Sequence, residues 1–367
     1  MRSNILVRYF CGLMLSIGFP LAALNAQDNS RPAIIAYYTG HNRPATVTQL
    51  SKITHIIYSF CHLRGNRIHI RSKSDSAAIR KLVDAKKQHP RLKVLLALGG
   101  WGGCKTCSTV FASEQGRTEF AESVSNALEY FRADGLDLDW EYPAIPGYPG
   151  HPWQRGDKDN FTALLQVLRK RLGTDKELSF AAGAYYRALQ QSIDWADAAR
   201  YVDRIHLMTY DLRSSRHNTT GHHAPLFSTS AQEESADFAV RYLQQHGVPL
   251  NKIVIGAAFY GRIFNLSAAA SDGLFEPGKF SRFIQYRSLL PMLKQGKYRP
   301  MYDSTAQAAF AISADKSRFV TYENISSVQA KARYVLGRGL AGLMFWELSQ
   351  DTPAIGFVDA IHDVFRN

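Results

Sequence analysis

Apolar residues recur along this chain with two different periods. Short apolar runs rich in β-branched and aromatic residues alternate with longer segments in which apolar residues return every three or four positions. Two of these longer segments have their apolar positions at Phe120, Val124, Ala127, Leu128 and Phe131, and at Phe161, Leu164, Leu165, Leu168 and Leu172. This spacing predicts amphipathic helices with one core-facing side. Strand-like runs that alternate with helices predict an α/β fold built on a parallel sheet.

One ten-residue stretch, Asp-Gly-Leu-Asp-Leu-Asp-Trp-Glu-Tyr-Pro at 134–143, carries the clearest chemical signal. Alternate side chains of a strand point to opposite faces, and residues two apart lie roughly 6 to 7 Å from each other. One face would therefore hold Asp137, Asp139 and Glu141, and the other Leu136, Leu138 and Trp140. Carboxyl groups this close push one another's pKa values apart, so that one stays protonated near neutral pH. The pattern indicates acid catalysis.

Two other interpretations of this stretch are a solvated surface strand and a cation site. A solvated strand would not need three large apolar residues on its other face unless helices covered that face. A calcium loop needs a glycine at its tight turn and a later bidentate glutamate, in a loop composition that this stretch lacks. Asp134 has the wrong parity for the acidic face and, followed by Gly135, is typical of a turn that enters the strand.

The four acids resemble the Asp-x-x-Asp-x-Asp-x-Glu signature of the family 18 glycoside hydrolases, which are mostly chitinases. Eight segments of the chain resemble the barrel strands of that family, in the same order. They are 33–38, 54–60, 92–101, the acidic stretch, 178–184, 203–211, 252–262 and 341–349. The resemblance implies a TIM (β/α)8 barrel formed by 27–262 and 320–367. About 80 residues separate the last two strands, more than one loop and helix require. We therefore expect a small α+β insertion between strands 7 and 8, at 263–319.

The resemblance also assigns roles to the acidic stretch. Glu141 matches the family's proton donor, Asp139 the carboxylate that orients the substrate's N-acetyl group, and Asp137 the inner carboxylate that shares a proton with Asp139. Family 18 enzymes use the substrate's own acetamide instead of a second carboxylate nucleophile. Its carbonyl oxygen attacks C1 to give an oxazolinium ion, which water then opens with retained configuration. This chemistry requires a 2-acetamido sugar, and it implies no metal and no cofactor.

Further residues match the family's substrate site. In Met208-Thr-Tyr-Asp211, Tyr210 would offer its hydroxyl group to the acetamide oxygen and Asp211 would bind the sugar, unless the two form a buried structural pair. Trp346 matches the tryptophan on which the sugar at the cleavage site stacks. The remaining expected substrate-binding residues are Tyr37, Phe60, Gly99, Gly100, Trp101, Tyr142 and Met208.

The chain departs from the family pattern at Ala97, where the motif before the two glycines has a serine that supports the inner aspartate. This change alters a tuning position and not the proton donor. Three other residues near the expected site have open interpretations. Trp153 fits either a rim platform or simple packing, and Tyr260 and Arg262 lie at the end of the expected seventh strand without a clear role.

The first 26 residues are typical of a secretory signal peptide. Arg2 and Arg8 precede an apolar stretch at 10–24, and cleavage is expected after Ala26. An uncleaved anchor is the alternative, although Gly18 and Pro20 interrupt a stretch that is short for a membrane span. We expect secretion to the extracellular space or periplasm, with no membrane attachment after cleavage.

Three cysteines remain after this cleavage. Cys104 and Cys107 are predicted to form a local disulfide, with a pairing of Cys61 to either of them as the alternative. His217, His222 and His223 cluster in the loop after the sixth strand, but they lack a carboxylate partner at metal-binding spacing.

The formal net charge of +13 raises the possibility of nucleic acid or anionic polymers as partners. The cationic residues are scattered over predicted helices, so solvated helix faces explain them better. We expect a monomer that acts on chitin or chitooligosaccharides and binds no nucleic acid. The alternatives are an endo-β-N-acetylglucosaminidase acting on N-glycans and a chitin-binding lectin, although such lectins typically replace the catalytic glutamate.

Overall fold

The structure is a computed structural model that describes residues 31–40, 45–267, 271–352 and 356–366. The expected signal peptide at 1–26 lies outside these residues. Residues 32–367 form one compact unit. Within the described residues, no helix combines the length and the apolar character that a membrane span requires.

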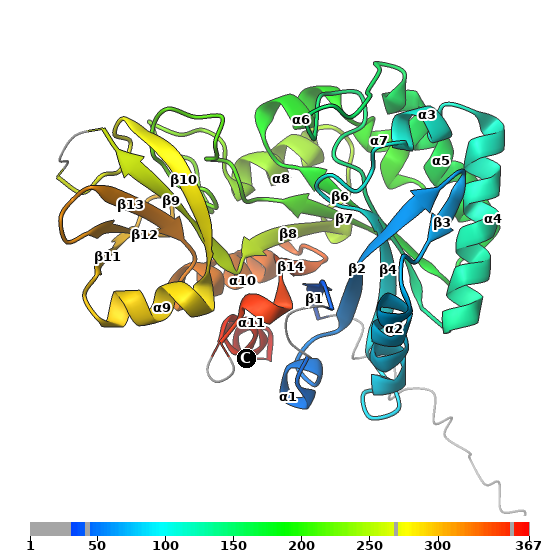
Figure 1. The fold of residues 1–367 in the computed structure, drawn as a ribbon, viewed down its shortest axis with the longest axis horizontal. Helices are drawn as coiled ribbons and strands as arrows, with labels where there is room; N and C mark the ends of the chain where they lie inside the picture. The colour runs from blue at the N-terminus through cyan, green and yellow to red at the C-terminus, as the bar shows by residue number, and fades with distance from the viewer. Residues whose placement is uncertain (1–30, 41–44, 268–270, 353–355, 367) are drawn as a thin grey trace, which may run out of the picture. The chain divides into compact units, whose positions relative to one another are not determined.

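Eight parallel strands close into a barrel (Figure 1), which confirms the predicted fold class. In spatial order they are β1 (Ala33–Tyr38), β2 (His55–Arg64), β4 (Lys93–Gly99), β5 (Gly135–Asp139), β6 (Glu177–Gly183), β7 (Arg204–Met208), β8 (Ile253–Ala258) and β14 (Gly342–Trp346). Strand β1 pairs with both β14 and β2 and so closes the ring. A short strand, β3 (Arg67–His69), extends β2 as an antiparallel hairpin.

Helices lie between the strands along the chain and surround the barrel (Figure 1). They are α1 (Val47–Leu50), α2 (Lys73–Ala85), α3 (Cys107–Phe111), α4 (Glu114–Phe131), α5 (Asp157–Leu172), α6 (Tyr186–Gln191), α7 (Trp195–Ala199), α8 (Ala236–Gln245), α10 (Ile325–Arg338) and α11 (Phe357–Arg366). The two amphipathic segments predicted from the sequence are α4 and α5. Their apolar positions are buried, except for the half-buried Ala127, because they cover the outer side of the barrel strands.

A second sheet is formed by the chain between β8 and α10. Its antiparallel strands are β9 (Tyr260–Leu266), β10 (Gly278–Gln285), β11 (Tyr298–Asp303), β12 (Ala308–Ser313) and β13 (Arg318–Tyr322), in the order β10-β9-β13-β12-β11, with helix α9 (Tyr286–Lys294) following β10. The expected seventh barrel strand, 252–262, was therefore too long. It ends at Ala258, and Tyr260 to Arg262 pair within the second sheet. The division into 27–262, 263–319 and 320–367 stays a prediction.

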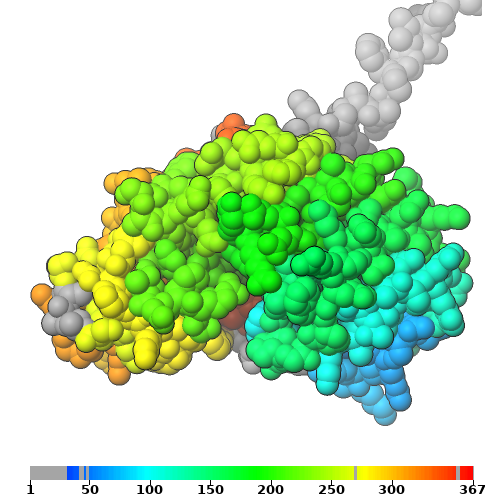
Figure 2. All heavy atoms as spheres, turned by 90° about the horizontal axis from the view of Figure 1, so that it is seen from above, coloured from blue at the N-terminus to red at the C-terminus, as the bar shows by residue number. Residues whose placement is uncertain are grey.

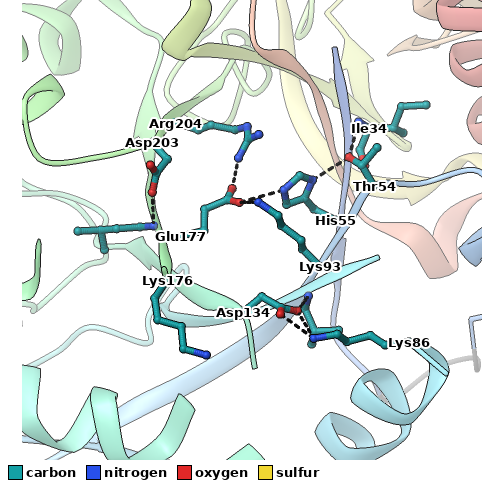
Figure 3. Close-up of polar contacts among 12 residues, drawn as sticks. Ile34, Thr54, His55, Lys86, Lys93, Asp134, Lys176, Glu177, Asp203 and Arg204 are labelled. Atoms are coloured by element: carbon teal, nitrogen blue, oxygen red, sulfur yellow. Dashed lines mark hydrogen bonds and ion pairs between the residues drawn. The ribbon is translucent and has the colours of Figure 1, made fainter. Parts of the chain in front are cut away.

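At the N-terminal end of the barrel, the first residues of four strands meet around one buried carboxylate (Figure 3). Glu177 Oε2 lies 3.1 Å from His55 Nε2 and 3.0 Å from Lys93 Nζ, and Glu177 also pairs with Arg204. We call His55, Lys93, Glu177 and Arg204 the basal ion cluster. Beside it, Asp134 lies at the entry to β5, as predicted, and pairs with Lys86. These contacts join β2, β4, β6 and β7 at the end of the barrel opposite to Asp139, the last residue of β5.

Candidate active site

The acidic stretch divides its side chains between two environments, as the alternation predicts. Leu136, Leu138 and Trp140 are buried in the core between the barrel and its helices. Asp137 lies inside the barrel and Asp139 follows it on the same side of β5. One detail differs from the expectation. Strand β5 ends at Asp139, so Glu141 does not end the strand but lies two residues beyond it.

Three side chains from three other strands contact Asp137 inside the barrel. Tyr37 of β1 donates its hydroxyl hydrogen to Asp137 Oδ2 over 2.8 Å, and Ser179 of β6 donates to Oδ1 over 2.6 Å. His206 Nδ1 of β7 lies 3.3 Å from Asp137 Oδ1 and 3.0 Å from the Tyr37 hydroxyl oxygen. Tyr37 was expected at the site, but Ser179 and His206 were not. The signal that could have revealed His206 is its parity, since it lies two and four residues before Met208 and Tyr210.

The two carboxyl groups nearest the mouth of the barrel have raised pKa values. Burial, followed by the charges of Glu141 and Asp137, raises the pKa of Asp139 well above its usual range. Asp139 Oδ1 is buried, and no described residue makes a hydrogen bond to it. Burial also raises the pKa of Glu141 to about 7, against the opposing effects of the Tyr142 hydroxyl and Arg216. Glu141 can therefore either give or take a proton near neutral pH, beside an Asp139 whose surroundings favour its neutral form.

Strand β7 and the residues after it bring the Met-Thr-Tyr-Asp motif to the same place. Burial and the neighbouring carboxylates, Asp139 first among them, raise the pKa of Tyr210 well above its usual range, so its hydroxyl keeps its hydrogen. Asp211 has a left-handed backbone with φ of 62°. It accepts a hydrogen bond of 2.7 Å from Tyr260 and pairs with Arg262.

Tyr260 and Arg262, which had no clear role in the sequence, both contact Asp211 from the second sheet. Burial acts to raise the pKa of Asp211, but His223 and Arg262 outweigh it and hold this pKa below its usual range. Asp211 is thus an anion at neutral pH, and its charge is already paired with a guanidinium group.

Aromatic rings line the mouth of the barrel. Trp346 stacks on Phe60 with ring centroids 5.5 Å apart and contacts Tyr37 at 5.9 Å, and Met208 packs in the same cluster. Tyr142 contacts Tyr185 edge-on. Seen from above, Figure 2 shows a hollow between green and blue-green segments, with red atoms of the C-terminal part of the chain at its floor. Of the predicted aromatic residues, Tyr37 and Phe60 are thus brought together around Trp346.

Trp101 and Trp153 lie further out. Trp101 is 55% exposed and contacts the ring of Tyr148. Trp153 is 42% exposed, which fits a rim position better than core packing.

Gly99 and Gly100 allow the backbone after β4 to pass close to the site. Both have positive φ angles, of 112° and 79°. A Cβ atom at Gly99 would lie 2.1 Å from the carbonyl oxygen of Asp139, and one at Gly100 would lie 2.4 Å from the Phe60 ring. The loop that follows contains the disulfide between Cys104 and Cys107, which is the first of the two predicted pairings, while Cys61 is a buried free thiol.

The histidine cluster after β7 serves other contacts. His222 Nε2 lies 3.0 Å from Asp303 Oδ2, and His223 packs against the Tyr260 ring. Among the described residues, no group of three or more histidine, cysteine or acidic side chains is arranged to hold a metal ion. The site offers proton transfer and polar contacts, together with aromatic stacking.

Comparison with known proteins agrees with the fold and with the geometry of the site. Residues 33–351 match the model of the glycosyl hydrolases family 18. The chain belongs to this family. The resemblance carried by the four acids is thereby confirmed, and it extends over the barrel and the second sheet.

Two curated relatives and two solved structures show the range of this likeness. The chain is 31% identical to Probable chitinase 2 of Drosophila melanogaster, over 81% of this chain and 66% of the relative, and 31% identical to Chitotriosidase-1 of Mus musculus, over 81% and 67%. It thus spans about two thirds of the length of these relatives. A family 18 N-acetylglucosaminidase from Paenibacillus barengoltzii is 31% identical with a TM-score of 0.81, covering 91% of this chain and 99% of that one. Ostrinia furnacalis Group IV chitinase has a TM-score of 0.84 at 25% identity, over 92% and 100%.

Proposed function

We propose that this family 18 member is a chitinase, which hydrolyses β-1,4 linkages between N-acetylglucosamine units of chitin and chitooligosaccharides with Glu141 as proton donor. One observation carries this proposal. Glu141 is the site carboxyl group whose pKa, at about 7, suits proton transfer in both directions near neutral pH. It lies directly after Asp137 and Asp139, at the mouth of the barrel where the aromatic rings gather.

The other carboxyl groups of the site are poorly suited to act as a nucleophile. The surroundings of Asp139 favour its neutral form, Asp137 is fully buried, and Asp211 is paired with Arg262. A retaining reaction then needs a nucleophile from the substrate itself, and the 2-acetamido group of N-acetylglucosamine supplies one. This argument supports a substrate class that carries an N-acetyl group at C2.

In the proposed reaction, the sugar at the cleavage site stacks on Trp346. Glu141 gives its proton to the glycosidic oxygen as the bond from C1 to that oxygen breaks, and the acetamide carbonyl oxygen forms a new bond to C1. Tyr210 donates a hydrogen bond to the acetamide oxygen, and Asp139 orients the acetamide nitrogen. Water then attacks C1 and gives a proton to Glu141 while the oxazolinium ring opens, so that the configuration at C1 is retained.

The test is hydrolysis of chitotetraose and of an N-glycopeptide by the purified protein and by Glu141→Gln, with products identified by mass spectrometry. Chitobiose released by wild type alone supports the proposal. Release of single N-acetylglucosamine units would instead place the chain with enzymes such as the Paenibacillus barengoltzii relative. Cleavage of the glycopeptide alone would indicate an endo-β-N-acetylglucosaminidase. Binding of chitotetraose without turnover would indicate a lectin.

We also propose that the protein is secreted after cleavage at Ala26 and acts as a monomer. The basic and apolar pattern of the first 26 residues supports export. Sequencing the N-terminus of exported protein tests the cleavage site, and a cell-retained full-length chain would indicate the anchor instead.

A further inference from the structure

Asp137 has unequal neighbours on the two sides of its own strand. In the strand registers, Asp137 is paired with Ala97 of β4 on one side and with Ser179 of β6 on the other. Register partners in a parallel sheet present their side chains to the same face, so all three lie inside the barrel. The β4 side presents only the methyl group of Ala97 to Asp137. A hydroxyl group lies instead on the β6 side, 2.6 Å from Asp137 Oδ1.

His206 supplies a further contact from β7. The single hydroxyl hydrogen of Tyr37 is given to Asp137 Oδ2, so the 3.0 Å contact between Tyr37 and His206 requires a hydrogen on Nδ1 of the histidine. Nδ1 also lies 3.3 Å from Asp137 Oδ1. His206 is fully buried, and its Nε2 has no hydrogen-bond partner among the described residues. Its Nδ1 side therefore makes all of its described polar contacts.

The titratable groups that face Asp137 are Tyr37 from β1, Asp139 from β5, and His206 and Tyr210 from β7 and the residues after it. Hydrogen bonds donated to a carboxyl group favour its ionised form. The charge of Asp137 is one of the causes that raise the pKa of Asp139, so groups that hold Asp137 in place also act on Asp139. A neutral Asp139 is what the proposed reaction uses to orient the acetamide group.

We propose that Ser179 and His206 are positioning residues for Asp137, on the side of its strand opposite the methyl group of Ala97. Ser179 holds Asp137 directly as a hydrogen-bond acceptor, His206 holds the Tyr37 hydroxyl group that donates to it, and together they keep the shared proton on Asp139. This inference rests on the proposed hydrolysis.

The test moves the hydroxyl group beside Asp137 from residue 179 on β6 to residue 97 on β4. Ser179→Ala is expected to lower kcat for chitotetraose about tenfold, the order of effect when a hydrogen bond to a charged group is lost, with little change in KM. The acid side of the kcat profile should move up by about one pH unit, the equivalent of a tenfold gain in proton affinity. Ser179→Ala combined with Ala97→Ser should recover most of both effects.

Ser108→Ala is the matched control, because Ser108 Oγ donates to the buried carboxylate of Asp157 over 3.0 Å on the outer helices. It should leave the pH profile in place. For His206, replacement by Asn keeps a donor near the position of Nδ1 and should preserve most of kcat, whereas replacement by Leu should act like Ser179→Ala.

An unchanged pH profile in Ser179→Ala, or the absence of rescue by Ala97→Ser, would overturn the inference while wild-type hydrolysis upheld the proposed function. If wild type hydrolyses nothing, the proposed function fails, and thermal unfolding at pH 7 still tests the contact. Ser179→Ala should then have a lower Tm that Ala97→Ser restores, whereas the loss in Ser108→Ala should not respond to Ala97→Ser. If Ala97→Ser changed the Tm of Ser179→Ala and of Ser108→Ala equally, a serine at residue 97 would not be replacing the contact of Ser179 with Asp137.

Discussion

The pKa of Glu141 sets the pH range in which the site can donate a proton, and Arg216 offers a way to move it. Burial raises this pKa to about 7, while Arg216 acts in the opposite direction. With this pKa, about nine in ten Glu141 side chains hold a proton at pH 6, against about one in fifty for an ordinary glutamate. Replacing Arg216 by Gln removes a cation that favours the charged form. The pKa should therefore rise, and the alkaline side of the activity profile should move to higher pH.

The size of the shift follows from the position of Arg216. Its side chain is exposed, and its guanidinium group lies 4.8 Å from the centre of the Tyr185 ring, which in turn contacts Tyr142. Exposed charge pairs are typically worth about 0.2 to 1 kcal/mol. Since one pKa unit is about 1.4 kcal/mol, we expect a shift of about 0.1 to 0.7 pH unit. The shift should shrink at high salt, because salt screens exposed charges.

The assay is kcat/KM for chitotetraose between pH 4 and 9, since this ratio reports the ionisations of the free enzyme. Arg187→Gln is the control. Arg187 is exposed and influences Tyr185 as Arg216 does, but it does not contribute to the shift of Glu141. An alkaline limb that stays in place in Arg216→Gln, or that moves equally in both variants, would refute the assignment of this limb to Glu141.

Three further predictions concern other parts of the molecule. Glu177→Gln should cost about 3 to 5 kcal/mol in urea unfolding, because it leaves the charge of Arg204 without its buried partner. Burial alone would raise the pKa of Glu177, but His55, Arg204 and Lys93 hold it below its usual range. The stability that Glu177 contributes should therefore be present above about pH 4 and fall as the pH drops further. This pH dependence should be missing in the variant. Gly100→Ala should lower both Tm and kcat, since its Cβ would meet the Phe60 ring at 2.4 Å, and a variant with normal values would contradict that clash. Trp346→Ala should raise KM for chitotetraose about two- to tenfold through lost stacking, and an unchanged KM would exclude this ring from the substrate site.

Local patterns in the sequence predicted the repeated elements and the acids well. Helices α4 and α5 follow from their apolar spacing, and β1 was predicted with its exact bounds. The ends of strands were predicted less well. Glu141 lies beyond β5 because a strand ends where its hydrogen-bonded neighbours end, which local alternation does not reveal. For the same reason the run after Ala258 continued the strand pattern, although it pairs with a different sheet.

The inner contacts of Asp137 depend on residues that are distant in the sequence. Ser179 is 42 positions away and His206 is 69, and after the charged first residue of its strand each is the one polar residue among apolar neighbours. Taken singly, such residues predict only a satisfied polar group in the core. Strand register adds the missing information, because parallel pairing places Ser179 on one side of Asp137 and Ala97 on the other.

The same reasoning explains why a missing motif residue is weak grounds for predicting an inactive site. A carboxylate inside a barrel can receive hydrogen bonds from either neighbouring strand and from strands across the interior, and Asp137 receives them from β1 and β6, with β7 within reach. What the chemistry requires is a set of donors around the carboxylate and not a donor at one sequence position. Ala97 offers no donor on β4, but Ser179 on β6 donates to Asp137, and His206 on β7 contacts the Tyr37 hydroxyl group that donates to it. The donors of such a site are therefore found by following strand register and side-chain parity outward from the acid.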